Sequence, residues 1–446
     1  MTDVYFWPVA MLLGLMAGIF AGYPVAFVLA GVGIIFAFLA DVPVLFLSIG
    51  VQRIFSGVLT NWLLIAIPLF VFMGLMLERS GIAERLLRSL ASLFRTVPGG
   101  YAFAVALIGV IMAASTGIIG ASVVLMGMMA LPVMRDNGYD PRISSGLIAA
   151  SGTLGILIPP SVMLIILGDQ LSISVGALFM GAMMPGLLLA GLYVAYLLFV
   201  VWRSPERMPA AKSAPAMSLK EAALSLAMDL LLPIVLILSV LGTIVAGIAT
   251  PTESAAIGAA GAMLLALFSR RLNLGVLGQA LRDTTSTTAM IVFVMIGATI
   301  FSLIFRKLGG DDMIIELFRL EEHSPYVVLL IVMAFVFVLG FFLEWVEITL
   351  VVVPLIAPVI AGLDFGLTTD QTLIWFAVAL AVNLQTSFLT PPFGYALFYL
   401  RGIAPDLPIT TIYRGVIPFV LLQLTGLALI ILFPAISLWL PSVVGR

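Results

Sequence analysis

Oxygen-bearing side chains gather beside two double prolines in this otherwise apolar chain. In the first half, a segment of small and hydroxyl-bearing residues precedes the double proline at 159–160, and it holds Ser115, Thr116, Gly117 and Ser122. In the second half, the residues that lead into the double proline at 391–392 are Asn383, Thr386, Ser387 and Thr390. Glycine lets carbonyl groups turn inward, and hydroxyl oxygens add hard donors of the kind that holds Na⁺ in broken transporter helices. Both groups are therefore candidates for ion or substrate binding. Close packing through small residues is the alternative explanation for the first group.

The double prolines must interrupt the helices that carry them. Each lies in a hydrophobic stretch long enough to cross a bilayer. A proline removes a backbone donor and collides with the carbonyl group one turn earlier. Unwound backbone at membrane depth is tolerated only where it is buried in protein or lines a polar cavity. Matched interruptions in the two halves of a chain are typical of a transporter binding site.

The composition indicates an integral membrane protein. Of 446 residues, 63% are hydrophobic and 9% are charged, whereas soluble domains carry about a quarter charged residues. Long apolar runs predict α-helices rather than barrel strands. The net charge of −2 argues against nucleic acid as a partner, and zero cysteines with one histidine exclude thiolate and His-cluster metal sites. No basic region or cleavage site marks a signal peptide, so the first helix is expected to stay as a membrane span.

Apolar blocks set the expected organisation. In the first half they cover 5–21, 24–40, 62–77, 101–134, 145–168 and 177–202, and in the second 230–249, 254–268, 285–305, 326–361, 373–400 and 411–440. The blocks 101–134 and 326–361 are too long for one helix across a core about 30 Å thick. Each is predicted to hold one span followed by a re-entrant hairpin. A polar linker, 203–220, separates a first repeat (1–202) from a second (221–446), and its basic residues favour the cytoplasmic side.

The two halves carry the same landmarks in the same order. The double prolines at 159–160 and 391–392 are 232 residues apart, and Pro185 and Pro418 are 233 apart. Earlier in each half, Pro132 and Pro358 are 226 apart. Three matching anchors predict an internal repeat, which is common in secondary transporters.

Two carboxylates inside an apolar block invite a functional explanation. Glu344 and Glu347 are costly there unless they face water, a partner or a site. At least one is expected to orient the second hairpin or to lie at the mouth of a cavity. A catalytic acid–base pair is conceivable, although no nucleophile or metal-binding constellation accompanies it.

Other polar segments have structural explanations. The run Thr250-Pro251-Thr252-Glu253 fits a capping box at a helix start, and Asp311-Asp312 fits the cap of an interfacial helix. Two amphipathic basic segments, 83–95 and 270–282, suit helices lying in the interface with arginines toward lipid headgroups. Plain anchoring of a loop is the alternative for both.

The chain resembles the large membrane subunit of the TRAP (tripartite ATP-independent periplasmic) transporters over nearly its whole length. The motifs that carry the resemblance are Ile65-Ala66-Ile67-Pro68-Leu69-Phe70 with Arg79-Ser80-Gly81, Ile158-Pro159-Pro160-Ser161, Thr250-Pro251-Thr252-Glu253 and Leu389-Thr390-Pro391-Pro392-Phe393-Gly394. The resemblance implies an all-α polytopic protein of the bacterial inner membrane, with two inverted repeats, re-entrant hairpins, Pro-Pro broken helices and an elevator mechanism. It also implies no enzymatic activity and no cofactor, with Na⁺ as the coupling ion.

The resemblance further implies partners and sites. The partners would be a small four-helix membrane subunit, a periplasmic substrate-binding protein, membrane lipid and a small organic anion. One sodium site would comprise Ser115, Thr116, Gly117, Gly155, Ile158 and Pro159, and the other Gly340, Ser387, Thr390 and Phe393. A substrate cavity would comprise Ser122, Ser161, Glu344, Asn383 and Thr386. Where many relatives have a serine-rich hairpin tip, this chain has Gly117-Ile118-Ile119-Gly120, and Glu344 stands where relatives often carry aspartate.

Two alternatives differ from a binding-protein-dependent transporter. A stand-alone sodium- or proton-coupled carboxylate carrier would need no partner. An intramembrane enzyme, such as a lipid transferase, could use Glu344, Glu347 or Asp311. No Walker A sequence is present to indicate a nucleotide-driven pump.

Overall fold

The computed structural model describes residues 5–116, 119–210, 219–317, 323–391 and 394–444. Those residues form helices and connecting turns and contain no β-strand. The helices of the first half are α1 Phe6–Phe20, α2 Val25–Leu39, α3 Val44–Ile54, α4 Ala66–Arg79, α5 Ile82–Leu93, α6 Gly100–Thr116, α7 Ile119–Asp136, α8 Pro141–Thr153, α9 Val162–Gln170 and α10 Val175–Arg203. Those of the second half are α11 Leu219–Val245, α12 Pro251–Phe268, α13 Leu274–Lys307, α14 Gly310–Leu317, α15 Pro325–Leu339, α16 Trp345–Glu347, α17 Val353–Gly362, α18 Thr369–Ser387, α19 Tyr395–Ile403, α20 Ile409–Leu432 and α21 Ala435–Val444.

The apolar surface of these helices matches a lipid environment. Within the described chain, 7 helical segments are long and apolar enough to cross a membrane. Large apolar side chains point outward, among them Leu45 (81% exposed) and Trp202 (79% exposed). Such surface would be unfavourable in water but is compatible with lipid. The chain is therefore an all-helical, multi-pass membrane protein.

The helices of the two halves correspond in order. Each half begins with two helices (α1–α2 and α11–α12) and includes a short arm (α5 and α14) followed by a helical hairpin. Each then continues through an interrupted helix (α8–α9 and α18–α19) to a long helix (α10 and α20). Contacts between halves follow the same correspondence, because α2 packs on α13 as α12 packs on α4, and α8 packs on α20 as α18 packs on α10. The two halves are therefore interlocked.

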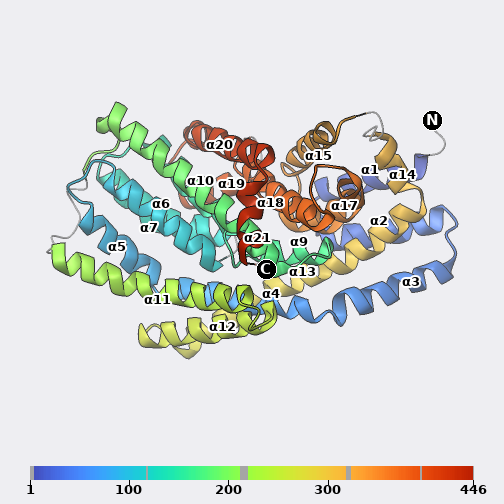
Figure 1. Cartoon of the computed structure of the whole chain (residues 1–446), viewed down its shortest axis with the longest axis horizontal. Coiled ribbons are helices and arrows are strands. Elements are labelled where there is room, and N and C mark those ends of the chain that lie inside the picture. The colour runs from blue at the N-terminus through green and yellow to red at the C-terminus, as the bar shows by residue number, and fades with distance from the viewer. Residues whose placement is uncertain (1–4, 117–118, 211–218, 318–322, 392–393, 445–446) are drawn as a thin grey trace.

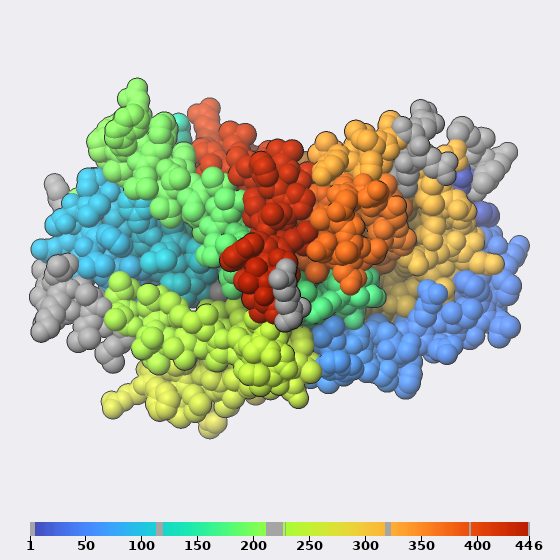
Figure 2. All heavy atoms as spheres, viewed as in Figure 1, coloured from blue at the N-terminus to red at the C-terminus, as the bar shows by residue number. Residues whose placement is uncertain are grey.

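The helices can be divided into two groups (Figure 1). We call α1–α4 with α11–α13 the scaffold group, in which α11, α12 and α3 run along the lower edge of Figure 1. We call α6–α10 with α15–α21 the hairpin group. The arms α5 and α14 connect the scaffold group to the hairpins along the chain. Figure 2 shows the C-terminal residues (red) covering the middle of one face, where α21 packs on α10 and α18.

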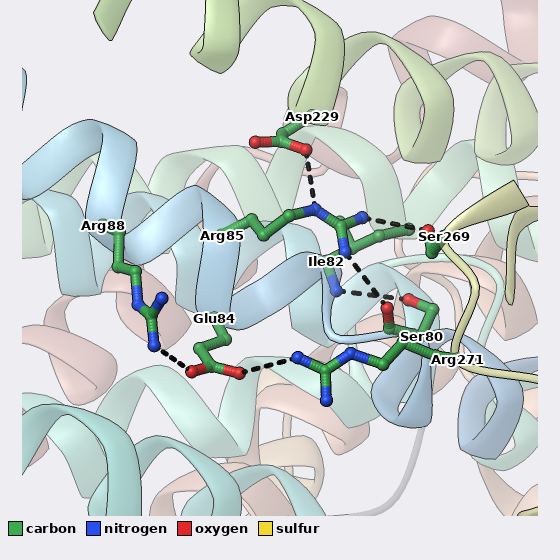
Figure 3. Close-up of polar contacts among 8 residues, drawn as sticks. All are labelled: Ser80, Ile82, Glu84, Arg85, Arg88, Asp229, Ser269 and Arg271. Carbon is green, nitrogen blue, oxygen red and sulfur yellow. Dashed lines mark hydrogen bonds and ion pairs between the residues drawn. The ribbon is translucent and has the colours of Figure 1, made fainter.

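The arm α5 is tied to the scaffold group (Figure 3). Arg85 Nε donates to Asp229 of α11 at 2.9 Å, and its Nη2 donates to Ser269 at 3.0 Å. Glu84 lies between Arg88, 2.5 Å away, and Arg271, 3.8 Å away. The helix predicted at 83–95 is present, but Arg85 serves protein contacts instead of facing lipid headgroups.

Ion pairs also join helix ends near the central linker. Arg207, which follows α10, pairs with Asp140 before α8 at 2.6 Å. Arg135 of α7 pairs with Asp406 in the turn before α20. The hydrogen bond from Arg135 holds the pKa of Asp406 below its usual range.

Four predicted segments had wrong boundaries. Each overlong block forms a hairpin of two helical arms with no separate span before it. In the first block the arms are α6 and α7, and in the second they are α15 and the helical segment 345–362, joined by a turn at 340–344. The basic segment 270–282 is not a separate interfacial helix, because Asn273 caps the continuous helix α13. The block 411–440 is two helices, because Pro434 separates α20 from α21.

One helix was missed. The first half contains α3, which runs into a π-helical turn at Phe55–Leu59. Its polar residues Ser48, Gln52 and Arg53 interrupt the apolar pattern, so segment 44–59 does not stand out as an apolar block.

Candidate functional site

The second interrupted helix ends at the predicted residues. Helix α18 ends at Ser387, non-helical backbone follows, and α19 begins at Tyr395. The described part of the break is held by backbone bonds, such as Thr390 N–H to Ser387 O at 3.1 Å and Gly394 N–H to Thr390 O at 3.1 Å. The predicted break beside the double proline is therefore confirmed.

Hydroxyl groups at this helix end have fixed orientations. Thr386 Oγ1 donates to Val382 O at 2.8 Å, Ser387 Oγ to Leu384 O at 2.8 Å, and Thr390 Oγ1 to Thr386 O at 2.7 Å. A hydroxyl that donates its only hydrogen in this way keeps two acceptor lone pairs. Thr386 and Ser387 are fully buried, and Thr390 is partly buried. The helix end thus presents oriented oxygen acceptors near its electronegative terminus.

The second hairpin touches this helix end at Gly340. A Cβ atom built on Gly340 would lie 2.8 Å from Ser387 Cβ, and it would lie even closer to Ser387 Oγ. Only a residue without a side chain therefore fits there. Asn383 joins the same pair of helices, because its Nδ2 donates to Met333 O of α15 at 2.8 Å. The structure brings together Gly340 and Ser387, which sequence reasoning placed in one site.

The first interrupted helix has the same plan with fewer side-chain oxygens. Helix α8 ends at Thr153, a 3-10 turn covers Leu154–Ile156, and α9 begins at Val162. Gly155 and Ile158 are buried, and the peptide between Pro159 and Pro160 is cis. Ser161 is also buried, and its hydroxyl donates to Ile156 O at 2.7 Å. The Ser161 hydroxyl therefore holds the non-helical backbone between α8 and α9 in place.

The first hairpin packs beside this break. Helix α6, which carries Ser115 and Thr116 at its end, contacts both α8 and the turn at 154–156. Ser122 is buried on α7, the other helix of the hairpin. Gly117 of the first predicted site and Phe393 of the second lie outside the described residues.

A small cavity of about 70 Å³ lies between the two hairpins. Its lining residues are Ile119, Gly120, Glu344, Trp345, Phe388, Tyr395 and Tyr399. Glu344 is the N-cap residue of α16 and interacts with the Tyr395 hydroxyl. Among the residues predicted for the substrate cavity, Glu344 lines this space, whereas Asn383, Thr386 and Ser161 donate to backbone carbonyl groups.

Glu347 lies in a more apolar setting than Glu344. Its side chain is buried next to a largely apolar cavity between α1, α13 and the second hairpin. Its Oε2 has no hydrogen-bond partner among the described residues, and the carboxyl group interacts with the backbone N–H of Glu344. Glu344 thus occupies the N-cap position and Glu347 the third position of α16, but the Glu344 side chain makes no capping hydrogen bond.

A buried polar cluster between the halves was not predicted. Gln423 of α20 donates from Nε2 to the Tyr193 hydroxyl of α10 at 2.7 Å, and Gln385 of α18 approaches the same hydroxyl at 3.5 Å. Gln423 Nε2 also lies 3.4 Å from Thr153 Oγ1 at the end of α8. These side chains join both interrupted helices to the two long helices. Gln385 was visible in the sequence beside Thr386, but Tyr193 and Gln423 sit alone in apolar runs.

Carboxylate or histidine clusters do not supply an alternative site. No group of three or more His, Asp or Glu side chains that could hold a metal occurs in the described part of the chain. The oxygen donors at the two interrupted helices are hydroxyl and carbonyl groups, which suit a monovalent hard cation better than a transition metal.

Comparison with known proteins identifies the family. The family model described as "Tripartite ATP-independent periplasmic transporter, DctM component" matches residues 12–436. A sialic acid TRAP transporter large permease protein of Vibrio cholerae is 32% identical over 437 residues, covering 97% of this chain and 98% of the relative. A C4-dicarboxylate TRAP transporter large permease protein of Rhodobacter capsulatus is 30% identical, covering 97% and 98% respectively.

Solved structures agree on the fold. The Alcanivorax borkumensis YdaH transporter matches with a TM-score of 0.59 at 17% identity, covering 87% of this chain and 89% of that one. MtrF of Neisseria gonorrhoeae matches with a TM-score of 0.55 at 11% identity, covering 89% and 85%. Both support a transporter fold, and the sequence matches are of transporter permeases and not of enzymes. The chain belongs to the DctM component family of the tripartite ATP-independent periplasmic transporters.

Proposed function

We propose that this chain is the large membrane subunit of a sodium-coupled secondary transporter that imports a small organic acid by an elevator movement. A periplasmic binding protein would deliver the acid, and a small four-helix subunit would complete the scaffold group. Relatives are named for sialic acid, C4-dicarboxylates and 2,3-diketo-L-gulonate, all of which are organic acids.

The observation that carries sodium coupling is the contact of Gly340 with Ser387 at the broken helix. A hairpin tip without a side chain faces hydroxyl groups whose hydrogens are already donated to carbonyl groups. The free lone pairs, together with backbone oxygens at a helix carboxyl end, favour a cation. At the first break, backbone carbonyl oxygens near Gly155 would take this role. The contacts described for these residues include no carboxylate, which is the ligand type that would favour a divalent ion over Na⁺.

The separation of helix groups supports an elevator movement. Both hairpins and both interrupted helices belong to the hairpin group, and the group can therefore carry both proposed sodium sites as one body. The scaffold group holds the arm α5 through Arg85 and Asp229. Motion would then occur at the connections that follow the arms, which is the hinge type of domain movement.

The small membrane subunit is a partner suggested by the family and by one relative. An isethionate TRAP transporter permease of Oleidesulfovibrio alaskensis, named DctMQ, aligns with this chain over 58% of its own length at 28% identity. The remaining length of that relative could hold a fused small subunit. In the present protein, the exposed apolar surface of α3 and of the turn after it, with Leu45 on the helix and Phe55 in the turn, would accept such a partner.

Transport by purified components tests the proposal. Liposomes containing this chain and its small subunit are supplied with the binding protein and radiolabelled acids, and an inward gradient of Na⁺ is compared with one of K⁺. We expect uptake only with Na⁺ and only with the binding protein. Uptake without a sodium gradient would refute the coupling, and uptake by this chain alone would establish a stand-alone carrier instead.

A further inference from the structure

A polar cavity of about 330 Å³ lies between the scaffold group and the hairpin group. It is formed by α3 and the turn after it, α9, α13 and the second hairpin, and its polar lining includes Arg53, Asn61, Asp169, Thr299, Ser302 and Arg306. Its volume is in the range of small-molecule sites, which begins at about 300 Å³. It shares no residue with the small cavity at Glu344.

The charges in this cavity favour an anion. Arg53 forms no ion pair with the described residues. Arg306 Nη2 donates to Pro354 O at 2.6 Å, which fixes the guanidinium. Arg306 Nε is buried and forms an ion pair with Asp311 at 3.7 Å, but it has no hydrogen-bond acceptor within the described chain. A buried donor without an acceptor is costly, and a planar guanidinium suits a carboxylate ligand.

The single acidic side chain of the cavity is already hydrogen-bonded. Asp169 Oδ1 accepts from Asn61 Nδ2 at 2.7 Å, and Oδ2 accepts from Gln170 Nε2 at 3.0 Å. A second carboxylate of a ligand would be repelled by Asp169. A hydroxyl group would instead donate to it, because carboxylate oxygens have further lone pairs.

We propose that this cavity binds the transported acid, with Arg53 and Arg306 receiving one carboxylate and Asp169 receiving hydroxyl groups. The substrate class is then a monocarboxylate that carries hydroxyl groups, and not a C4-dicarboxylate. This inference rests on the proposed function, which it deepens by naming the substrate class and a binding site.

The cavity lies away from the linker, toward the opposite end of α10. Asp169 lies near the end of α9, shortly before α10 begins at Val175, whereas the linker follows the other end of α10. A helix of 29 residues is about 43 Å long. With the basic linker on the cytoplasmic side, the cavity would lie toward the side on which a periplasmic protein would release its ligand.

Two contacts in the cavity cross between the helix groups. Asn61, just before α4, bonds to Asp169 of α9, and Arg306 of α13 bonds to Pro354 O of the second hairpin. A carboxylate on Arg306 competes with Pro354 O for the same guanidinium. Binding of the acid would thereby loosen the contact between the scaffold group and the second hairpin, which couples arrival of the ligand to movement.

Cysteine labelling tests the inference independently of transport. The chain contains no cysteine, so Ser302→Cys places one reactive group in the cavity. The assembled complex in detergent is treated with an anionic, a cationic or a neutral methanethiosulfonate reagent, and labelling of this subunit is followed by mass spectrometry. If Ser302→Cys prevents assembly, Thr299→Cys lines the same cavity and replaces it.

The charge of the cavity is measured first. Arg306→Gln or Arg53→Gln, added to Ser302→Cys, is expected to lower the ratio of anionic to cationic labelling rates at least about fivefold, as expected for loss of a charge a few ångströms away. Arg282→Gln is the matched control, because Arg282 is exposed near the other end of α13. An unchanged ratio in both cavity variants would overturn the proposal.

The class of ligand is tested by measuring how strongly each candidate acid protects the cysteine from labelling by the neutral reagent. N-acetylneuraminate, a hydroxylated monocarboxylate, is expected to slow labelling at least about fivefold, whereas succinate protects less. Protection by succinate as strong as that by N-acetylneuraminate would overturn the substrate class, and protection by neither would overturn the site. Sodium-independent uptake would refute the proposed function but leave the labelling results standing, so the two failures are distinguishable.

Discussion

Replacing Gly340 by alanine tests the contact on which the second sodium site depends. The added Cβ would lie 2.8 Å from Ser387 Cβ, whereas ordinary contact begins at 3.4 Å. The hairpin must therefore move by at least 0.6 Å, the difference between 3.4 and 2.8 Å. Rotation of the Ser387 hydroxyl does not relieve this overlap, because Ser387 Cβ itself is too close, and rotation would also break the bond to Leu384 O.

The expected cost follows from this displacement. Overpacking of a buried contact costs about 1–3 kcal/mol of stability, and misplacement of a binding group by about 1 Å can cost 100-fold in activity. We expect Gly340→Ala to raise the Na⁺ concentration for half-maximal uptake at least about tenfold and to lower the thermal unfolding midpoint. Gly362→Ala is the control, because a Cβ there meets no atom within 4 Å in the same hairpin.

A second substitution separates steric overlap from general damage. Ser387→Gly removes the atoms that collide with the new Cβ, so the double variant with Gly340→Ala should regain thermal stability relative to Gly340→Ala alone. Sodium affinity should stay low in the double variant, since the hydroxyl oxygen is gone. Normal stability and normal sodium dependence in Gly340→Ala would refute the assignment of this contact to the site.

Other substitutions test neighbouring parts of the argument. Asn383→Ala removes the bond to Met333 O and should destabilise the subunit by about 1–3 kcal/mol, measured by thermal unfolding in detergent. Thr250→Ala breaks the confirmed capping box and should cost about 1 kcal/mol, while Thr285→Ala in an exposed helix interior should cost nothing measurable. Arg85→Ala should destabilise by about 1–2 kcal/mol, with its partial exposure taken into account, whereas Arg88→Ala on the same arm should cost under about 0.5 kcal/mol. Ser387→Ala and Thr390→Ala should weaken the sodium dependence of uptake, and Ile158→Val should leave it unchanged; equal effects of all three would contradict the role of side-chain oxygens.

Sequence reasoning succeeded where a residue constrains the backbone locally. The double prolines at 159–160 and 391–392 lie where helices are interrupted, and Thr250 to Glu253 carries its own capping chemistry, so the structure confirms both predictions. Family membership was likewise carried by local motifs.

Predictions failed where the outcome depends on distant contacts. Arg85 looks like a lipid-facing side chain until the fold brings Asp229 beside it, 144 residues along the chain. Sequence reasoning assigned no role to Arg53 or Arg306, because only the packing of α3 against α13 places both on one cavity. A helix that continues through a polar segment, as α13 does, also defeats an argument based on apolar blocks.

The repeat is not chemically equal at its two breaks, and the difference bears on sodium binding. At the offset of 232 residues, Gly155 corresponds to Ser387 and Ile158 to Thr390. The second break therefore has side-chain hydroxyls at positions where the first has none. If both breaks hold Na⁺, the first must rely on backbone carbonyl groups and on the hairpin, while the second combines backbone with hydroxyl oxygens. Backbone ligands are insensitive to side-chain substitution but depend on the path of the chain. The first site should accordingly tolerate changes in side-chain chemistry and respond to changes in packing around the break, such as those at Gly186, whose Cβ would lie 2.7 Å from Ile158.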